Sequence, residues 1–234
     1  MNEDREREAA RVRAAYQRRA ELGLDARYDY WTPANLFIYQ SRERAFLRLL
    51  RDRDCLPLGQ QRVLDVGCGD GSVLRDLLRY GARPENLCGV DLLPDRVERA
   101  RERTPGASIE VGDAQSLPYP DARFDLILGF TLLSSVVDAV ARRRVASEML
   151  RVAKPGGQVV LYDFWVNPLN RDVRPLSHKD VDALFAGHTV AWRSVTLAPP
   201  ITRLLAPRPG GWLACTLLEM LPFLRTHFLA AVTA

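Results

Sequence analysis

Three glycines at alternating positions form the strongest chemical signal in the sequence: Gly67, Gly69 and Gly71. They follow the apolar run VLDV of residues 63–66 and precede a helical pattern. Glycine permits a tight turn and lets a bound molecule approach the backbone where a Cβ would collide. The next helix directs its free N–H groups to the same place. The segment therefore predicts either a ligand-binding turn or, more simply, a glycine turn that only joins a strand to a helix.

The spacing and the flanking charges discriminate between ligands. A dinucleotide-binding fingerprint is G-x-G-x-x-G, and its third glycine lets the helix approach the strand. Here that position is Ser72, and the third glycine comes one residue earlier. Asp65 and Asp70 flank the turn, so a pyrophosphate would be repelled, whereas a ligand carrying an ammonium and a sulfonium would be attracted. The pattern points to S-adenosylmethionine.

Four segments in order resemble the class I S-adenosylmethionine-dependent methyltransferases, particularly the small-molecule group known as methyltransferase type 11. They are VLDVGCGDG, GVDLLPDRVERAR, VGDAQSLPYPDARFDLIL and LRVAKPGGQVVLYDF. The resemblance is close over residues 62–163 and looser beyond. It implies S-adenosylmethionine as the cofactor and methyl transfer to a small-molecule acceptor by direct in-line displacement.

The resemblance also implies a cofactor-binding set: Asp65, Gly67, Gly69, Gly71, Asp91, Leu92, Asp113, Ala114, Gly129 and Arg42. Asp91, at the end of the second strand, would accept from both ribose hydroxyls, or it caps the following helix. Asp113 would bind the adenine edge, or it forms a local Asx turn. Leu92 would lie against the adenine ring, or it belongs to the core. Arg42 would pair with the methionine carboxylate.

Candidates on the acceptor side are fewer. Many relatives carry a histidine after the fourth strand, but this chain reads GFTLLSSVVD there, with Thr131 as a pocket candidate. Asp163, at the end of the fifth strand, is the catalytic candidate, and its alternative is a structural cap. The aromatic loop RYDYWTP offers three further pocket residues, which are equally packing anchors: Tyr28, Tyr30 and Trp31. We assign no role to the three histidines, and we favour O-methylation over N-methylation.

Composition excludes several other classes. The net charge is +4 and the charges are interleaved, so no basic stripe for nucleic acid is visible. The four cysteines lie far apart, which argues against a metal site. The N-terminus has no apolar core for a signal peptide, and no apolar stretch is long enough to span a bilayer. The default expectation is a cytoplasmic protein, and a homodimer stays open.

Alternating strands and helices from residue 62 onward predict an α/β fold, a doubly wound Rossmann-like sheet of seven strands whose last strand is antiparallel. Two helical patterns precede it. We therefore expect an N-terminal helical lid over residues 1–54 and a cofactor-binding domain over residues 55–234, with a cap insert at about 198–224. Two alternatives stay open: a catalytically inactive cofactor-binding partner of another methyltransferase, and a nicotinamide-dependent oxidoreductase.

Overall fold

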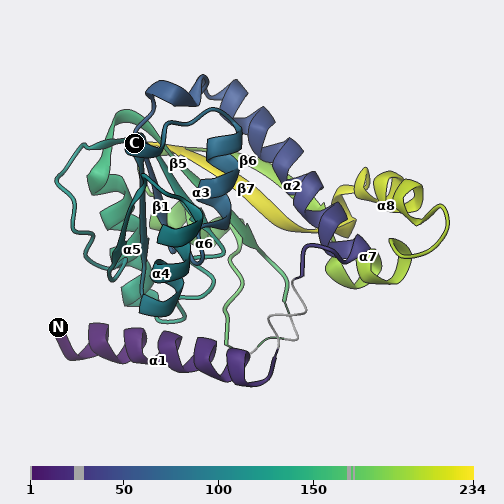
Figure 1. Cartoon of the computed structure of the whole chain (residues 1–234), viewed down its shortest axis with the longest axis horizontal. Helices are drawn as coiled ribbons and strands as arrows, with labels where there is room; N and C mark the ends of the chain where they lie inside the picture. Colours follow the sequence, from purple (N-terminus) through teal and green to yellow (C-terminus); the bar gives the residue numbers. More distant parts are fainter. Residues whose placement is uncertain (1, 24–28, 168–169, 171) are drawn as a thin grey trace.

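A computed structural model describes residues 2–23, 29–167, 170 and 172–234 of the chain. Its centre is a seven-stranded sheet in the order β3-β2-β1-β4-β5-β7-β6 (Figure 1). The strands are β1 (Val63–Val66), β2 (Leu87–Asp91), β3 (Ser108–Val111), β4 (Phe124–Phe130), β5 (Ala153–Phe164), β6 (Thr189–Leu197) and β7 (Arg225–Thr233). Strands β1 to β5 pair in parallel, and β7 is antiparallel to both β5 and β6. The predicted fold class is confirmed.

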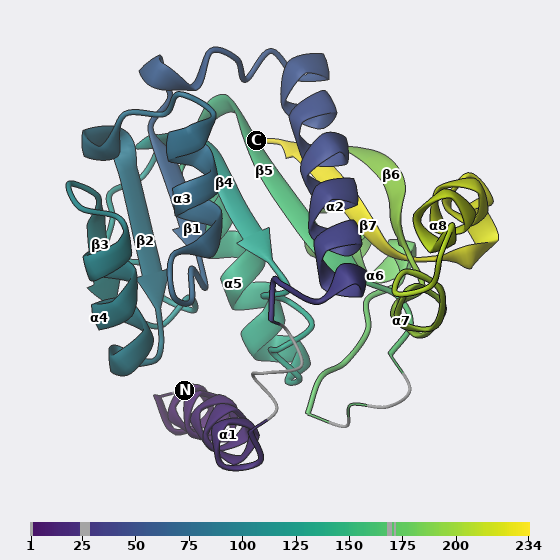
Figure 2. The same ribbon diagram turned by 45° about the vertical axis from the view of Figure 1, so that its right-hand side comes forward.

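Helices cover both faces of the sheet (Figure 2). They are α1 (Asn2–Glu21), α2 (Pro33–Asp52), α3 (Ser72–Arg79), α4 (Pro94–Arg103), α5 (Ala139–Val152), α6 (His178–Leu184), α7 (Pro199–Leu205) and α8 (Gly211–Glu219), with short 3-10 turns η2 (Leu58–Gln60), η3 (Pro84–Asn86) and η4 (Pro222–Leu224). One hydrophobic core joins the sheet to α5 and α6, and a second joins it to α2, α3 and α4.

Local sequence explains where these elements begin. Strand β1 is buried along its whole length, as expected for a parallel strand covered on both faces. The side chain of Thr32 caps α2, with Pro33 in the first turn, and the side chain of Asp138 accepts from the Ala141 N–H at the start of α5 at 2.7 Å. Such caps satisfy helix N–H groups that have no intrahelical partner.

One boundary differs from the expectation. Proline and glycine are rare inside strands, so residues 154–157 (KPGG) predict a turn before the fifth strand, but β5 already begins at Ala153. The pairing with β4 shifts register there, because Phe124 faces Ala153 whereas Leu126 faces Gln158. The extra residues form a bulge, which leaves the remaining pairs in register.

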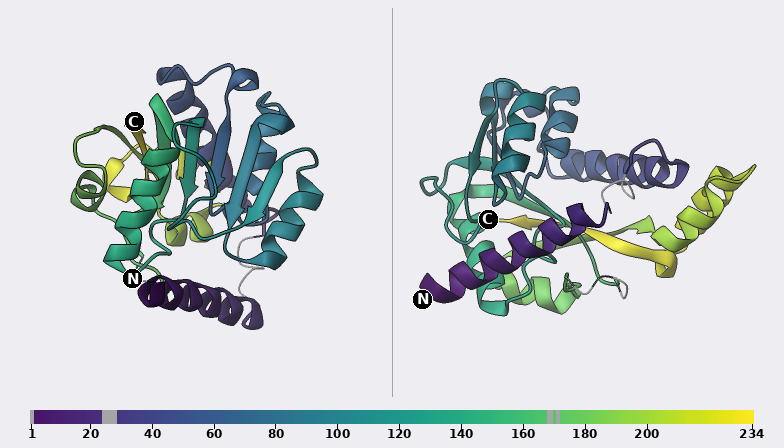
Figure 3. Two further views of the ribbon diagram at one scale, coloured as in Figure 1. Left: turned by 90° about the vertical axis from the view of Figure 1, so that its left-hand side faces the viewer. Right: turned by 60° about the horizontal axis from the view of Figure 1, so that its bottom comes forward.

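The two N-terminal helices have different positions. Helix α2 packs on the sheet, and its Phe46, Leu49 and Leu50 are buried in the second core. Helix α1 lies apart from the sheet faces and crosses the carboxyl ends of the parallel strands (Figure 3). Only α1 therefore has the position of a cover over that edge.

Candidate functional site

The glycine turn forms the floor of the candidate site. Gly67, Gly69 and Gly71 all have positive φ, at 73°, 56° and 79°, a region that side chains with a Cβ rarely adopt. The N–H groups of Gly67 and Cys68 donate to the carbonyl of Val90 at 2.7 and 3.1 Å. The turn is therefore held against the end of β2, with α3 beginning directly after it.

Asp91 connects the turn to β2. One carboxylate oxygen accepts from the Gly69 N–H at 2.9 Å, and the other accepts from the Leu93 N–H at 3.0 Å. Burial raises the pKa of this carboxyl, and the two backbone donors oppose that rise. Asp91 lies at the strand end as expected, but it does not cap α4, because its bond is to the Leu93 N–H and the start of α4 has no side-chain cap. Leu92 follows it and is half-buried.

Asp65 is the most unusual group in this region. Its side chain is 1% exposed, and its Oδ2 has no hydrogen-bond partner within the described part of the chain. Burial raises its pKa to about 8, the Asp91 carboxylate adds to the rise, and the Arg42 guanidinium opposes it. A buried carboxylate without a full set of donors is costly. A cation placed beside it would remove that cost.

Asp70, the other acid that flanks the turn, does not share this buried position. Its carboxylate pairs with the guanidinium of Arg103 on α4. The electrostatic argument against a pyrophosphate therefore depends on Asp65 and Asp91 rather than on Asp70.

Arg42 lies inside an aromatic cage. Its guanidinium carbon is 4.9 Å from the ring centre of Tyr39, 5.4 Å from that of Phe130 and 5.5 Å from that of Tyr162. Its ion pair with Asp76 is long, at 3.9 Å. Such rings stabilise a cation and keep it in place. Arg42 and Asp65 therefore offer a positive and a negative group at neighbouring points of the same edge.

Asp113 is engaged by the chain itself. Its Oδ1 accepts from the Gln115 N–H at 2.8 Å, which is the Asx turn weighed as its alternative, and its Oδ2 accepts from Arg5 Nε of α1 at 2.8 Å. Ala114 is half-buried against the first core. The segment lies where the adenine edge was expected, and the start of α1 covers it.

Gly129 and Thr131 flank the end of β4. A Cβ on Gly129 would lie 3.0 Å from the end of the Met149 side chain and 3.2 Å from that of Leu161, so a larger residue there would require these core side chains to shift. Thr131 is exposed and has a φ of 52°, which is rare for a β-branched residue. The next side chain, Leu132, lies so close to Gly67 that a Cβ there would be 2.9 Å from Leu132 Cδ1. The loop after β4 therefore closes over the glycine turn.

Asp163 is placed differently from an acceptor-facing base. It is 1% exposed, and its two oxygens accept from the N–H groups of Ser134 and Phe164, each at 3.0 Å. Burial raises its pKa to about 6, and these bonds oppose the rise. This geometry fits the structural alternative, since the carboxylate ties the loop after β4 to the end of β5.

The aromatic loop is only partly described, and Tyr28 lies outside the described residues. The Tyr30 ring stacks on Tyr39 at 5.5 Å between centres and meets Trp31 edge-on at 6.1 Å. Trp31 itself is largely exposed. Tyr30 thus extends the aromatic cage of Arg42 outward.

Helix α1 supplies contacts that the sequence did not reveal. The Tyr16 ring centre lies 4.2 Å from the guanidinium carbon of Arg96, which in turn lies beside Gly69. The buried Glu8 carboxylate accepts from the Val137 N–H at 2.7 Å, just before α5. Ala9, Val12 and Tyr16 recur at helical spacing and indicate an apolar side of this helix, but a buried acid next to them gives no periodic signal.

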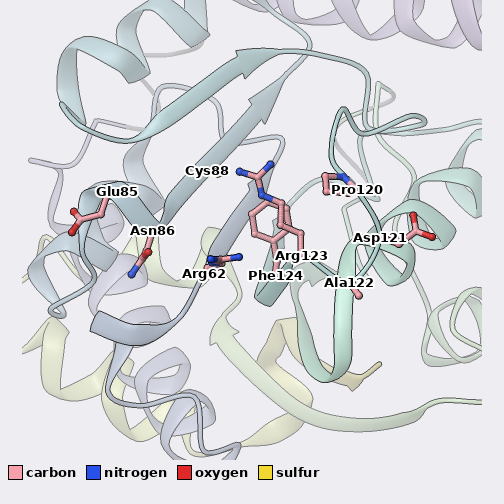
Figure 4. Close-up of a pocket in the computed structure, with 9 residues that line it drawn as sticks. All are labelled: Arg62, Glu85, Asn86, Cys88, Pro120, Asp121, Ala122, Arg123 and Phe124. Atoms are coloured by element: carbon pink, nitrogen blue, oxygen red, sulfur yellow. The ribbon is translucent and has the colours of Figure 1, made fainter.

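A separate hollow of about 520 Å³ lies at the opposite edge of the sheet (Figure 4). Its lining comes from the amino ends of β1, β2 and β4 and includes Arg62 and Arg123. It shares no residue with the glycine turn.

The described residues contain no cluster of side chains able to hold a metal ion, and none of the described helices is long and apolar enough to cross a membrane.

A parallel sheet with a glycine turn and acidic strand ends at its carboxyl edge defines a Rossmann-like domain of the nucleoside-binding class. Residues 63–157 match a family model described as a methyltransferase domain. Residues 63–157 are therefore similar to a methyltransferase domain, in agreement with the resemblance of the four motifs to the class I S-adenosylmethionine-dependent methyltransferases, and S-adenosylmethionine is the cofactor that such domains imply. The match favours this cofactor over the nicotinamide alternative.

Named relatives act on varied molecules. The chain is 37% identical to 2-methyl-6-phytyl-1,4-hydroquinone methyltransferase of Synechocystis sp., over 51% of this chain and 41% of that one. It is 31% identical to 27-O-demethylrifamycin SV methyltransferase of Amycolatopsis mediterranei, over 62% and 53%, and 34% identical to phosphatidylethanolamine N-methyltransferase of Cereibacter sphaeroides, over 57% and 63%. It thus spans less than two thirds of each relative's length.

Solved structures support the fold alone. A methyltransferase from Mesorhizobium loti aligns with a TM-score of 0.58 at 20% identity, covering 80% of this chain and 96% of that one. The [4+2]-cyclase SpnF aligns with a TM-score of 0.60 at 24% identity, covering 83% and 81%. The shared architecture therefore occurs in a protein that is named for a different reaction.

Proposed function

We propose that the protein is an enzyme that transfers a methyl group from S-adenosylmethionine to a small-molecule acceptor. The observation that carries the proposal is Asp65, a fully buried carboxylate with an unpartnered oxygen, among the described residues, beside the glycine turn. A ligand with an ammonium and a sulfonium supplies the positive charge that this site lacks.

In this proposal the methionine part of the cofactor lies between two opposite charges. Asp65 and the carbonyl of Gly67 bind the ammonium, and Arg42 binds the carboxylate. Arg42 suits this role because its aromatic cage holds the guanidinium in place, and because its positive charge acts on the Asp65 carboxyl and lowers the pKa of that group.

The nucleoside part is assigned to the ends of β2 and β3. Asp91 accepts from the ribose hydroxyls, and Asp113 and Ala114 face the adenine edge, with Leu92 against the ring. Asp91 and Asp113 already accept hydrogen bonds from backbone N–H groups. When the cofactor binds, its hydroxyl and amino groups would either replace these donors or bond to the same carboxylates beside them. When bound, S-adenosylmethionine supplies an electrophilic methyl group on a good leaving group. The protein then contributes chiefly proximity and orientation.

The acceptor is proposed to bind between α1, the loop after β4 and the aromatic residues Tyr30 and Trp31. Thr131 is the exposed polar group there. We propose Asp163 as a positioning residue for this loop, given its bonds to Ser134 and Phe164. Oxygen is the favoured acceptor atom and nitrogen the next. Among the relatives, the rifamycin enzyme is named for an oxygen position and the phosphatidylethanolamine enzyme for N-methylation. We propose that α1 alone, and not the whole of the predicted lid over residues 1–54, covers the site.

A second candidate is a protein that binds the cofactor without transferring its methyl group. The buried position of Asp163 favours it, because this acid is then not free to serve as a general base for an acceptor. The cyclase of similar fold supports it as well, since fold does not determine reaction.

One experiment separates these candidates. The full chain is incubated with methyl-labelled S-adenosylmethionine and a panel of phenols, hydroquinones and amines, and S-adenosylhomocysteine and labelled products are measured by mass spectrometry. Turnover with any acceptor supports methyl transfer. Tight cofactor binding without turnover across the panel supports the second candidate, and absence of binding refutes both.

A further inference from the structure

The insert between β6 and β7, residues 198–224, exposes an unusual amount of apolar surface. Seven of the fourteen large apolar side chains that are exposed among the described residues fall in it: Leu204, Trp212, Leu213, Leu217, Met220, Leu221 and Phe223. Met220 is 68% exposed and Phe223 is 80% exposed. Apolar side chains concentrated in this way mark an interaction surface, whereas single exposed ones are ordinary.

Helix α8 is apolar on both of its sides. Cys215 is buried and Leu218 is partly buried against the third core, which includes Phe37 of α2. On the other side, Leu213, Leu217 and Met220 follow one another at spacings of four and three residues and are all exposed, so they form one stripe. A helix that is apolar all round is normally covered. The exposed side of α8 is therefore a candidate surface for binding another molecule.

The insert projects from the body of the fold. Helices α7 and α8 extend beyond the end of β7 in three views (Figures 1, 2 and 3). A flat partner can therefore reach α8 without meeting the rest of the protein. Trp212, which meets Phe37 edge-on at 5.6 Å, anchors the start of α8 to α2, so the projection has a fixed base.

The charged groups that the insert offers to a partner are positive. It contains Arg203, Arg208 and Glu219 as its only charged residues. Glu219 is turned inward, where its carboxylate accepts from the Leu197 N–H and contacts the Ser41 hydroxyl. Within the described residues, Arg203 and Arg208 have no ion-pair partner. An insert that combines an exposed apolar stripe with two arginines outside any ion pair complements an anionic lipid surface, since apolar side chains enter the acyl region and guanidinium groups meet the phosphates.

The insert also lies at the functional edge of the sheet. Its two ends are paired at Leu197 and Arg225, and His227 pairs with Phe164 at the carboxyl end of β5. The same edge carries the glycine turn and Asp91. A surface that binds α8 therefore lies on the side from which an acceptor approaches.

We propose that residues 198–224 dock the protein on the surface of an anionic phospholipid membrane, with α8 lying in the interface and Leu213, Leu217 and Met220 inserted. This contact is independent of the proposed methyl transfer, because none of its residues belongs to the cofactor site. A second copy of the chain is the rival occupant of the same face, but two such faces would bring Arg203 and Arg208 of both copies together without carboxylates to offset them.

Vesicle co-sedimentation of the full chain without cofactor tests the proposal. Vesicles contain phosphatidylcholine alone, or phosphatidylcholine with phosphatidylglycerol at a ratio of about two to one. The wild type is expected to bind the anionic vesicles and to bind the neutral ones weakly. The triple variant L213N/L217N/M220N should bind the anionic vesicles about tenfold or more weakly. The double variant R203Q/R208Q should lose the preference for anionic vesicles.

Val140→Asn is the matched control, because Val140 is an exposed apolar residue on α5, outside the insert. It should bind as the wild type does, and circular dichroism should show all variants folded, since the apolar side chains that are altered are exposed. Absence of wild-type binding, or equal binding by the triple variant, overturns the proposal. A wild-type dimer in sedimentation velocity that the triple variant dissociates assigns the face to a second copy and overturns it as well.

Discussion

Replacing Asp65 by asparagine probes the charge that defines the site. Burial raises the pKa of Asp65 from an ordinary value near 3.8 to about 8, with the Asp91 carboxylate adding to the rise and Arg42 opposing it. A carboxyl with a raised pKa in the folded state favours folding below its unfolded pKa, and this contribution is lost as the pH rises toward the folded pKa. Over that window the loss amounts to roughly 6 kcal/mol as an upper bound, at about 1.4 kcal/mol for each pH unit.

An asparagine in place of Asp65 has a similar shape and no proton to lose. The free energy of unfolding of D65N, relative to the wild type, should therefore rise between about pH 4 and pH 8 and level off above it. Denaturant unfolding of the cofactor-free protein at pH 5, 7 and 9 measures this difference. Parallel pH profiles for the two proteins would refute the claim that Asp65 carries a strongly raised pKa.

Cofactor binding should also report on the protonation state of Asp65. A cation beside Asp65 favours its ionised form, so binding at pH 7 should release a proton. Calorimetry in two buffers of different ionisation enthalpy counts that proton, and D65N should show weaker binding without the release. Binding by D65N with wild-type affinity would mean that Asp65 does not face the cofactor.

Three further substitutions test other parts of the site. Asp91→Ala should weaken S-adenosylmethionine binding by roughly 2–4 kcal/mol in calorimetry, because two charge-assisted hydrogen bonds are lost; an unchanged affinity would remove the ribose assignment. Asp163→Asn keeps one acceptor oxygen but places an amide NH2 donor against the second of the two backbone N–H groups, so it should lower the free energy of unfolding by about 1–3 kcal/mol and leave cofactor affinity nearly unchanged. The reverse pattern would place Asp163 in the cofactor site. Glu8→Gln should loosen α1, seen as faster amide hydrogen exchange in residues 4–21, and unchanged exchange would show that other contacts hold the helix.

The sheet was predictable because its signals are local. The first two parallel strands are short apolar runs that end next to glycine or aspartate, VLDV before Gly67 and LCGV before Asp91. Parallel strands place those ends at one edge, which is why the glycine turn and Asp91 could be assigned to the same crevice. The long helices were also evident, since their apolar period persists over several turns.

Contacts between distant segments were not predictable in the same way. Nothing in the local pattern around Arg42 indicates that three rings from α2, β4 and β5 surround it. Asp70 and Asp65 look alike in sequence, yet one pairs with Arg103 on the surface and the other is buried without a full set of partners among the described residues. The catalytic candidate Asp163 has the right strand position, and only tertiary structure reveals that both of its oxygens are occupied.

Isothermal titration calorimetry of the full chain with S-adenosylmethionine, and separately with a nicotinamide dinucleotide, tests the central claim most directly. The crevice of Asp65, the glycine turn and Asp91 should bind S-adenosylmethionine at a single saturable site, and the dinucleotide should give no binding heat. Binding of the dinucleotide with no binding of S-adenosylmethionine would contradict the account.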